Sequence, residues 1–186
     1  LHVHLLAIGA ITNEDELTYY GDCARYFPQS GGLLLSYQLA SGSLDEDALP
    51  DFLELCAALA MAHHKQPTVP RDYKFSWDSD TIAQDLERFY PPALFPEVYD
   101  DEAEPFGIRE FNPLAGFLVR QWLTGIEWGP FTAQVCNHKF APGDLMGLLL
   151  RTTSYLRSLR QAGKDQPWSE AARQLQAQML RAPLGP

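Results

Sequence analysis

The chain has few cysteines, few basic residues and no hydrophobic run long enough to cross a membrane. Its 186 residues include three cysteines and 14 lysines and arginines against 24 aspartates and glutamates, which gives a formal net charge of −10. The cysteines, Cys23, Cys56 and Cys136, lie far apart, which argues against a disulfide framework and favours a reducing compartment such as the cytoplasm. No apolar run reaches the roughly 18 residues of a spanning helix, and no basic leader precedes the apolar start, so we expect neither a membrane span nor a signal peptide.

Signals for strands, cofactors and catalysis are also sparse. No Gly-rich loop ends in Gly-Lys-Ser/Thr, and no dinucleotide-binding fingerprint is present. The adjacent His63 and His64 would point about 100° apart on a helix, so we interpret them as a polar helix end rather than a metal site. The acidic run at 100–104 is typical of a solvated loop. We therefore expect no catalytic residue, no metal and no cofactor.

Helical patterning is what the chain does contain. Hydrophobic residues make up 46% of it, and their spacing predicts helices near 33–41, 52–63, 114–124 and 143–160 that pack together. Asn112 followed by Pro113 is typical of a capped helix start. Scattered β-branched residues and the absence of a hairpin-type turn argue against a sheet. We predict an all-α helical bundle, with one helical domain at 1–165 and a C-terminal helical tail at 166–186.

Charge is unevenly distributed along the chain. Residues 141–186 hold six basic and three acidic side chains, a balance of +3, whereas the first 140 residues hold eight basic and 21 acidic ones, a balance of −13. The acidic part discourages contact with a polyanion, and the C-terminal quarter does not share that character. The segment "APGDLMGLLLRTTSYLRSLRQ" at 141–161 carries three of the basic residues, Arg151, Arg157 and Arg160.

A helical wheel divides this segment into two faces. One face is a buried stripe, and the second line comprises Gly147, Arg151, Ser154 and Ser158. Small neighbours let a bulky backbone such as a nucleic-acid strand approach while the guanidinium reaches a phosphate. The alternative is that Arg151 forms a salt bridge within the acidic body. Spacing alone favours the salt bridge over the nucleic-acid contact. The buried stripe is predicted to consist of Leu145, Leu148, Leu149, Thr152, Leu156 and Leu159.

Five short motifs occur in a characteristic order. They are "LTYYGDCAR", "GGLLLSYQLASG", "ALPDFLELCAALAMA", "QWLTGIEWGPF" and "PGDLMGLLLRTTSYLRSLRQ". Their order and spacing over roughly residues 5–161 resemble the DSH C-terminal (DSHCT) domain, the helical accessory domain of superkiller-type and exosome-associated RNA helicases.

The resemblance implies a function for the segment at 141–161. In the family this domain packs on the helicase core and helps to line the channel for single-stranded RNA, and Arg151 matches the arginine that contacts RNA. Ser154, Arg157 and Ser158 follow on the same segment and are expected at this contact. Tyr37, which stands where the family has an acidic residue in the Leu-rich helix, is a further candidate. The chain has Leu150 and Pro142 where the family has arginine and glutamate.

Two functions follow as hypotheses from the sequence. The first is the C-terminal accessory domain of an ATP-dependent RNA helicase, which contacts single-stranded RNA weakly by itself and packs on a helicase core in cis or in trans. The second is a stand-alone acidic interaction module that kept the fold, lost RNA contact and binds a basic partner. Neither is catalytic by itself, because the chain has no phosphate-binding loop.

Overall fold

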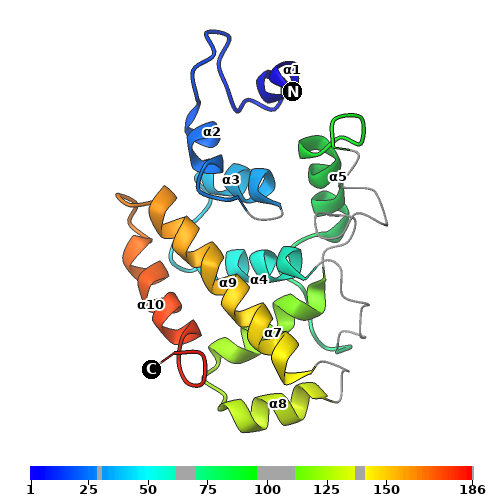
Figure 1. Cartoon of the computed structure of the whole chain (residues 1–186), viewed down its shortest axis with the longest axis vertical. Coiled ribbons are helices and arrows are strands. Elements are labelled where there is room, and N and C mark those ends of the chain that lie inside the picture. Colours follow the sequence, from blue (N-terminus) through cyan, green and yellow to red (C-terminus); the bar gives the residue numbers. More distant parts are fainter. Residues whose placement is uncertain (29–30, 62–69, 96–111, 137–140, 186) are drawn as a thin grey trace.

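The computed structural model describes residues 1–28, 31–61, 70–95, 112–136 and 141–185, and helices dominate them (Figure 1). No strand occurs in these ranges; one isolated antiparallel bridge joins Ile11 to Leu17. The predicted all-α class is therefore confirmed. None of the described helices is long and apolar enough to cross a bilayer. The helices are α1 (His2–Ala7), α2 (Tyr19–Ala24), α3 (Gly32–Ala40), α4 (Leu49–Ala60), α5 (Ser79–Phe89), α7 (Pro113–Leu123), α8 (Trp128–Cys136), α9 (Pro142–Ala162) and α10 (Ser169–Met179).

Helix α4 forms the centre of the core. Every side chain from Phe52 to Leu59 is buried, so this helix is enclosed on all sides, as expected of a helix with apolar residues around its whole circumference. Helices α7 and α9 pack directly on it, and α9 crosses it in Figure 1. Residues 62 and 63, which were predicted to extend this helix, lie outside the described residues, as do His64 and the acidic run at 100–104.

The long helix α9 links α4 to the C-terminal helix. All six residues of its predicted stripe are buried, and this inner face meets α4. Helix α10 packs on α9 and also touches α7. Ala172 and Met179 of α10, and its N-cap residue Trp168, belong to the same hydrophobic core as α4, so the segment after residue 165 is packed against the bundle.

Local capping signals fix several helix starts. The side chain of Asn112 accepts a hydrogen bond from the Leu114 N–H, and Pro113 occupies the first helical turn, as the sequence predicts. Helix α5 is capped by Asp78, whose carboxylate accepts from the backbone N–H and hydroxyl of Thr81, although the adjacent Ser79 and Asp80 are also of cap-forming types. Three neighbouring residues were all capable of capping, and only the folded backbone selects one of them.

Arg181 fastens the C-terminal segment to the end of α7. Its guanidinium lies 3.4 Å from the centre of the Trp122 ring and donates hydrogen bonds to the carbonyls of Trp122, Ile126 and Gln178. The Trp122 indole N–H in turn donates to the carbonyl of Met179 at 3.1 Å. Because the last carbonyls of a helix have no partner within it, a cation at this place satisfies them and complements the helix dipole.

Two glycines inside helices should respond oppositely to alanine. A Cβ on Gly116 of α7 would lie 2.7 Å from Cγ of Glu54, whereas a Cβ on Gly147 of α9 would meet only the Arg151 guanidinium, at 3.5 Å. We expect Gly147→Ala to raise the free energy of unfolding by up to about 1 kcal/mol through helix propensity. Gly116→Ala should lower it by about 1–3 kcal/mol through overpacking. Urea denaturation of both variants measures this, and equal effects would contradict the packing at α4.

Two tyrosines, the buried Tyr20 and the half-buried Tyr90, form a second matched pair. The Tyr20 hydroxyl is buried without a hydrogen-bond partner in the described part of the chain, whereas the Tyr90 hydroxyl accepts from the Leu33 N–H at 2.9 Å. Because an unsatisfied buried hydroxyl is costly, Tyr20→Phe should leave stability unchanged or raise it. Tyr90→Phe should lower the free energy of unfolding by about 1–3 kcal/mol, because the Leu33 N–H would lose this hydrogen-bond acceptor. Thermal or urea denaturation checks both, and a larger loss for Tyr20→Phe would contradict the described environments.

Candidate nucleic-acid interface

One face of α9 is open to solvent along most of its length. We call this face the α9 strip; its residues are three or four positions apart, so helical geometry stacks them in line. Each is exposed or half-exposed, and Leu150 retains 45% of its accessible surface. From residue 145 to residue 162 the helix carries three arginines and no acidic residue. The strip is therefore a positively charged surface on a negatively charged protein. It consists of Gly143, Gly147, Leu150, Arg151, Ser154 and Arg157.

Arg151 lies across the strip toward the C-terminal end of α4. Its Nε donates to the carbonyl of Gly147 at 3.3 Å, and its Nη2 lies 3.1 Å from Sδ of Met61. No carboxylate lies within 4.0 Å of the guanidinium in the described part of the chain, unlike Arg120 or Arg173. A guanidinium has five N–H donors, so donors are left over after these two contacts. The salt bridge considered from the sequence is not formed among the described residues.

Ser154 and Arg157 extend the same surface into the C-terminal half of α9. The Ser154 hydroxyl donates to the carbonyl of Arg151 at 2.7 Å, which leaves its oxygen able to accept. Arg157 is exposed and has no carboxylate partner among the described residues. Six residues separate the two arginines, which places their Cα atoms about 9 Å apart along the helix axis.

Two of the predicted contact residues do not belong to this surface. Ser158 is on α9 but is only 6% exposed. Tyr37 is on α3, where its ring packs against Tyr20 and Phe89 and lies under the Arg88 guanidinium, 5.2 Å away. Both residues therefore lie apart from the α9 strip, and their contact with nucleic acid stays a prediction.

Arg160 illustrates how α10 closes the far end of the strip. Its Nη1 donates to Oε1 of Gln176 on α10 at 2.6 Å. Farther along α10, Arg173 and Glu170 form a salt bridge at 2.6 Å, and hydrogen bonds from that arginine lower the pKa of Glu170 to about 2. Arg160 and Arg173 are thus engaged with residues of α10, and the arginines on the strip face solvent.

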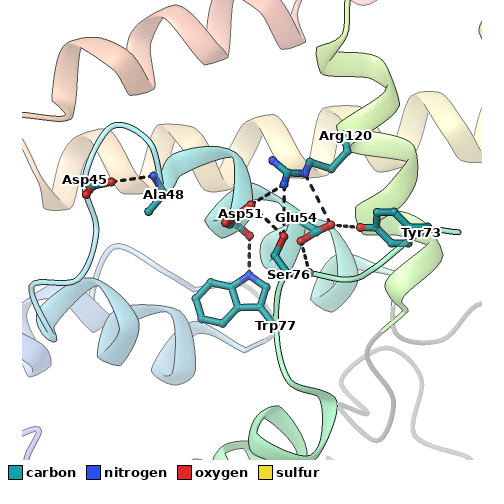
Figure 2. A network of polar contacts seen from close by, with 8 residues as sticks. All are labelled: Asp45, Ala48, Asp51, Glu54, Tyr73, Ser76, Trp77 and Arg120. Carbon is teal, nitrogen blue, oxygen red and sulfur yellow. Dashed lines mark hydrogen bonds and ion pairs between the residues drawn. The ribbon is translucent and has the colours of Figure 1, made fainter.

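A polar network at the N-terminal half of α4 was not foreseen from the sequence. Figure 2 shows Asp51 and Glu54 of α4 facing Arg120 of α7 and Ser76 of the segment before α5. Arg120 Nη2 lies 2.7 Å from Asp51 Oδ1, and its Nε lies 3.9 Å from Glu54 Oε1. The Ser76 N–H donates to Glu54 Oε2 at 3.0 Å, and the Tyr73 hydroxyl donates to Glu54 Oε1. A lone glutamate inside the apolar run "FLELCAALA" was the available signal.

The environment of Glu54 favours a structural role. Its side chain is fully buried, and this burial raises the pKa of the carboxyl because the charged form loses its hydration. The hydrogen bonds from Ser76 and the charge of Arg120 act in the opposite direction. Both carboxyl oxygens already accept from Tyr73 or Ser76, so the group faces its own partners rather than a substrate. In the described residues no group of three or more metal-ligating side chains occurs.

Two comparisons with known proteins identify no relative of this chain. No family model matches the chain. A search of curated proteins likewise finds no match.

The titration of Glu54 predicts the pH dependence of stability. Because its pKa is raised on folding, the native state holds a proton that the unfolded chain has already lost, and stability falls as pH rises through that interval. Glu54→Gln lacks this titration. We therefore expect the stability of the unmodified chain relative to Glu54→Gln to decline as pH rises above about 4. Urea denaturation at several pH values tests this, with Glu87→Gln on the exposed side of α5 as the control. A stability difference between the unmodified chain and Glu54→Gln that stays constant or rises with pH would contradict this prediction.

Proposed function

We propose that the chain is a DSHCT-like accessory domain of a cytoplasmic ATP-dependent RNA helicase and that the α9 strip contacts single-stranded RNA. The observation that carries this proposal is that Arg151 and Arg157 lie on one solvent-facing strip of α9 without a carboxylate partner among the described residues. The all-α fold and the order of the sequence motifs support it. The domain is not catalytic by itself and packs on a helicase core in cis or in trans.

The chemistry of the strip suits a nucleic-acid backbone more than its bases. Arginine pairs with phosphate oxygens through a planar set of N–H donors. The Arg151 guanidinium lies over Gly147, and the surface at Gly143 is open, since a Cβ there would have no neighbour within 4 Å. No aromatic side chain is exposed on the strip for base stacking. Contacts to the phosphate backbone depend on the charge and spacing of the phosphates and are independent of base sequence.

Binding by the domain alone should be weak and dependent on salt. Two phosphate contacts to a single strand give a slope of log K against log salt of about −1.4, that is, about −0.7 for each contact. The net charge of −10 also opposes approach of a polyanion. Within a helicase the other RNA contacts come from the core, and the strip adds its contacts to theirs.

An acidic interaction module is the second candidate function. The balance of −13 over the first 140 residues favours a basic partner, and Leu150 replaces the first arginine of the motif in the resembling family. The two candidates differ in the affinity of the α9 strip for RNA, which can be measured directly.

The test is substitution of Arg151 in an RNA-binding assay. Fluorescence anisotropy of labelled oligouridylate with the full chain, at several low salt concentrations, gives both affinity and salt slope. Arg151→Ala should weaken binding and reduce the magnitude of the slope by about 0.7, because one phosphate contact is lost. Arg173→Ala on α10 is the matched control, since it removes an exposed arginine that is paired with Glu170. Unchanged affinity and slope in Arg151→Ala, or an equal loss in Arg173→Ala, would overturn the proposal.

A further inference from the structure

A small cavity lies beside the N-terminal end of α4, away from the α9 strip. Its volume is about 180 Å³, well above the space that one water molecule requires. Asp51 lines it, whereas Arg151 touches Met61 just beyond the other end of the same helix, ten residues later. That spacing corresponds to about 15 Å along a helix axis. The cavity and the α9 strip are therefore separate surfaces. The residues that line the cavity are Gln38, Ser43, Leu44, Ala48, Asp51, Phe52, Ser76 and Trp77.

The cavity combines an aromatic ring with an available carboxylate oxygen. The half-buried Trp77 is held in place by its indole N–H, which donates to the Asp51 carbonyl at 2.7 Å (Figure 2). The Asp51 side chain is 41% exposed. Its Oδ1 contacts Arg120 and Ser76, and its Oδ2 has no hydrogen-bond partner in the described part of the chain. A cation seated here would meet both the face of an indole and a carboxylate, two attractions that add in a partly desolvated site.

The surroundings of the cavity are strongly acidic. Between residues 43 and 54 the chain has five acidic residues and no basic one. Asp78 and Asp80, at the start of α5, follow directly after Trp77. Arg120 supplies one positive charge nearby, but Asp51 and Glu54 already share it. The charge around the opening therefore complements a cation.

The N-terminus of α4 does not make the cavity favour an anion over a cation. An open helix N-terminus attracts anions through its unpaired N–H groups. Here the carboxylate of Asp45 accepts from the Ala48 N–H at 2.9 Å, and Pro50 in the first turn has no N–H. A carboxylate of the chain thus already occupies the position that an external anion would take.

We propose that this cavity docks an arginine side chain from a basic segment of a partner protein. The guanidinium lies against Trp77 and pairs with Asp51 Oδ2, while the acidic residues around the opening attract the rest of the segment. The aliphatic stem of the arginine packs on Leu44 and Phe52, which supply the apolar part of the lining. This protein-docking surface is additional to the RNA contact proposed for the α9 strip and does not depend on it.

The experiment titrates the full chain with a hexa-arginine peptide at physiological ionic strength. The readout is the NMR signal of the Trp77 indole N–H, assigned with a Trp77→Phe variant. The expected result is a saturable shift of that signal with hexa-arginine and none with hexa-citrulline, which has nearly the same shape without the charge. Failure of hexa-arginine to shift the signal, or an equal shift with hexa-citrulline, overturns the proposal.

Two matched variants separate docking from general attraction between opposite charges. Gln38→Lys places a competing cation at the cavity, and Gln84→Lys places the same charge on the exposed face of α5. Both exchange one good helix former for another. Gln38→Lys should weaken hexa-arginine binding about tenfold, comparable to the loss of a desolvated cation–aromatic contact, and Gln84→Lys much less. Equal losses, or a Trp77 shift caused by oligouridylate, would overturn the assignment to a basic protein segment.

Discussion

The enclosure of α4 from Phe52 to Leu59 is the constraint on which the rest of the structure depends. A stretch of helix that is buried on every side has no solvent face, so each of its polar groups must find a partner within the protein. Glu54 is the group for which this matters most, because it is ionisable and fully buried. Its carboxyl is satisfied by Tyr73, Ser76 and, at longer range, Arg120. One buried glutamate thus determines where the segment before α5 runs and which side of α7 faces the core.

The same constraint shapes α7 and α9. A glycine stands at position 116 because the Glu54 side chain occupies the space where a Cβ would lie. The leucine-rich inner face of α9 packs on α4. The outer face of α9 is divided between contact with α10 and exposure to solvent. On the side where α10 packs, Arg160 is bound to Gln176. Arg151 and Arg157 face solvent instead. Packing on α4 and α10 therefore decides which side chains of α9 remain in the α9 strip.

The sequence predicted what depends on local spacing and missed what depends on packing between distant segments. The leucine stripe of α9 and the Asn112 cap follow from periodicity and backbone chemistry, and both are confirmed. The placement of Tyr37 and Ser158 depends on which helices cover them, and no spacing rule contains that information. The contact of Arg120 with Asp51 joins residues far apart in the chain. An isolated glutamate within an apolar run indicates that partners must exist, but only the fold shows which residues they are.

The distribution of charge shows how an acidic protein can keep a surface for a polyanion. Charges in solvent are screened over about 8–10 Å at physiological ionic strength, and the cavity near Asp51 lies roughly 15 Å along α4 from the contact between Arg151 and Met61. The acidic side chains at one end of α4 therefore weaken the field at the other end only modestly. Low salt lengthens the range of that repulsion, but it also strengthens each arginine–phosphate contact. The α9 strip and the cavity near Asp51 can act independently because they lie at opposite ends of α4.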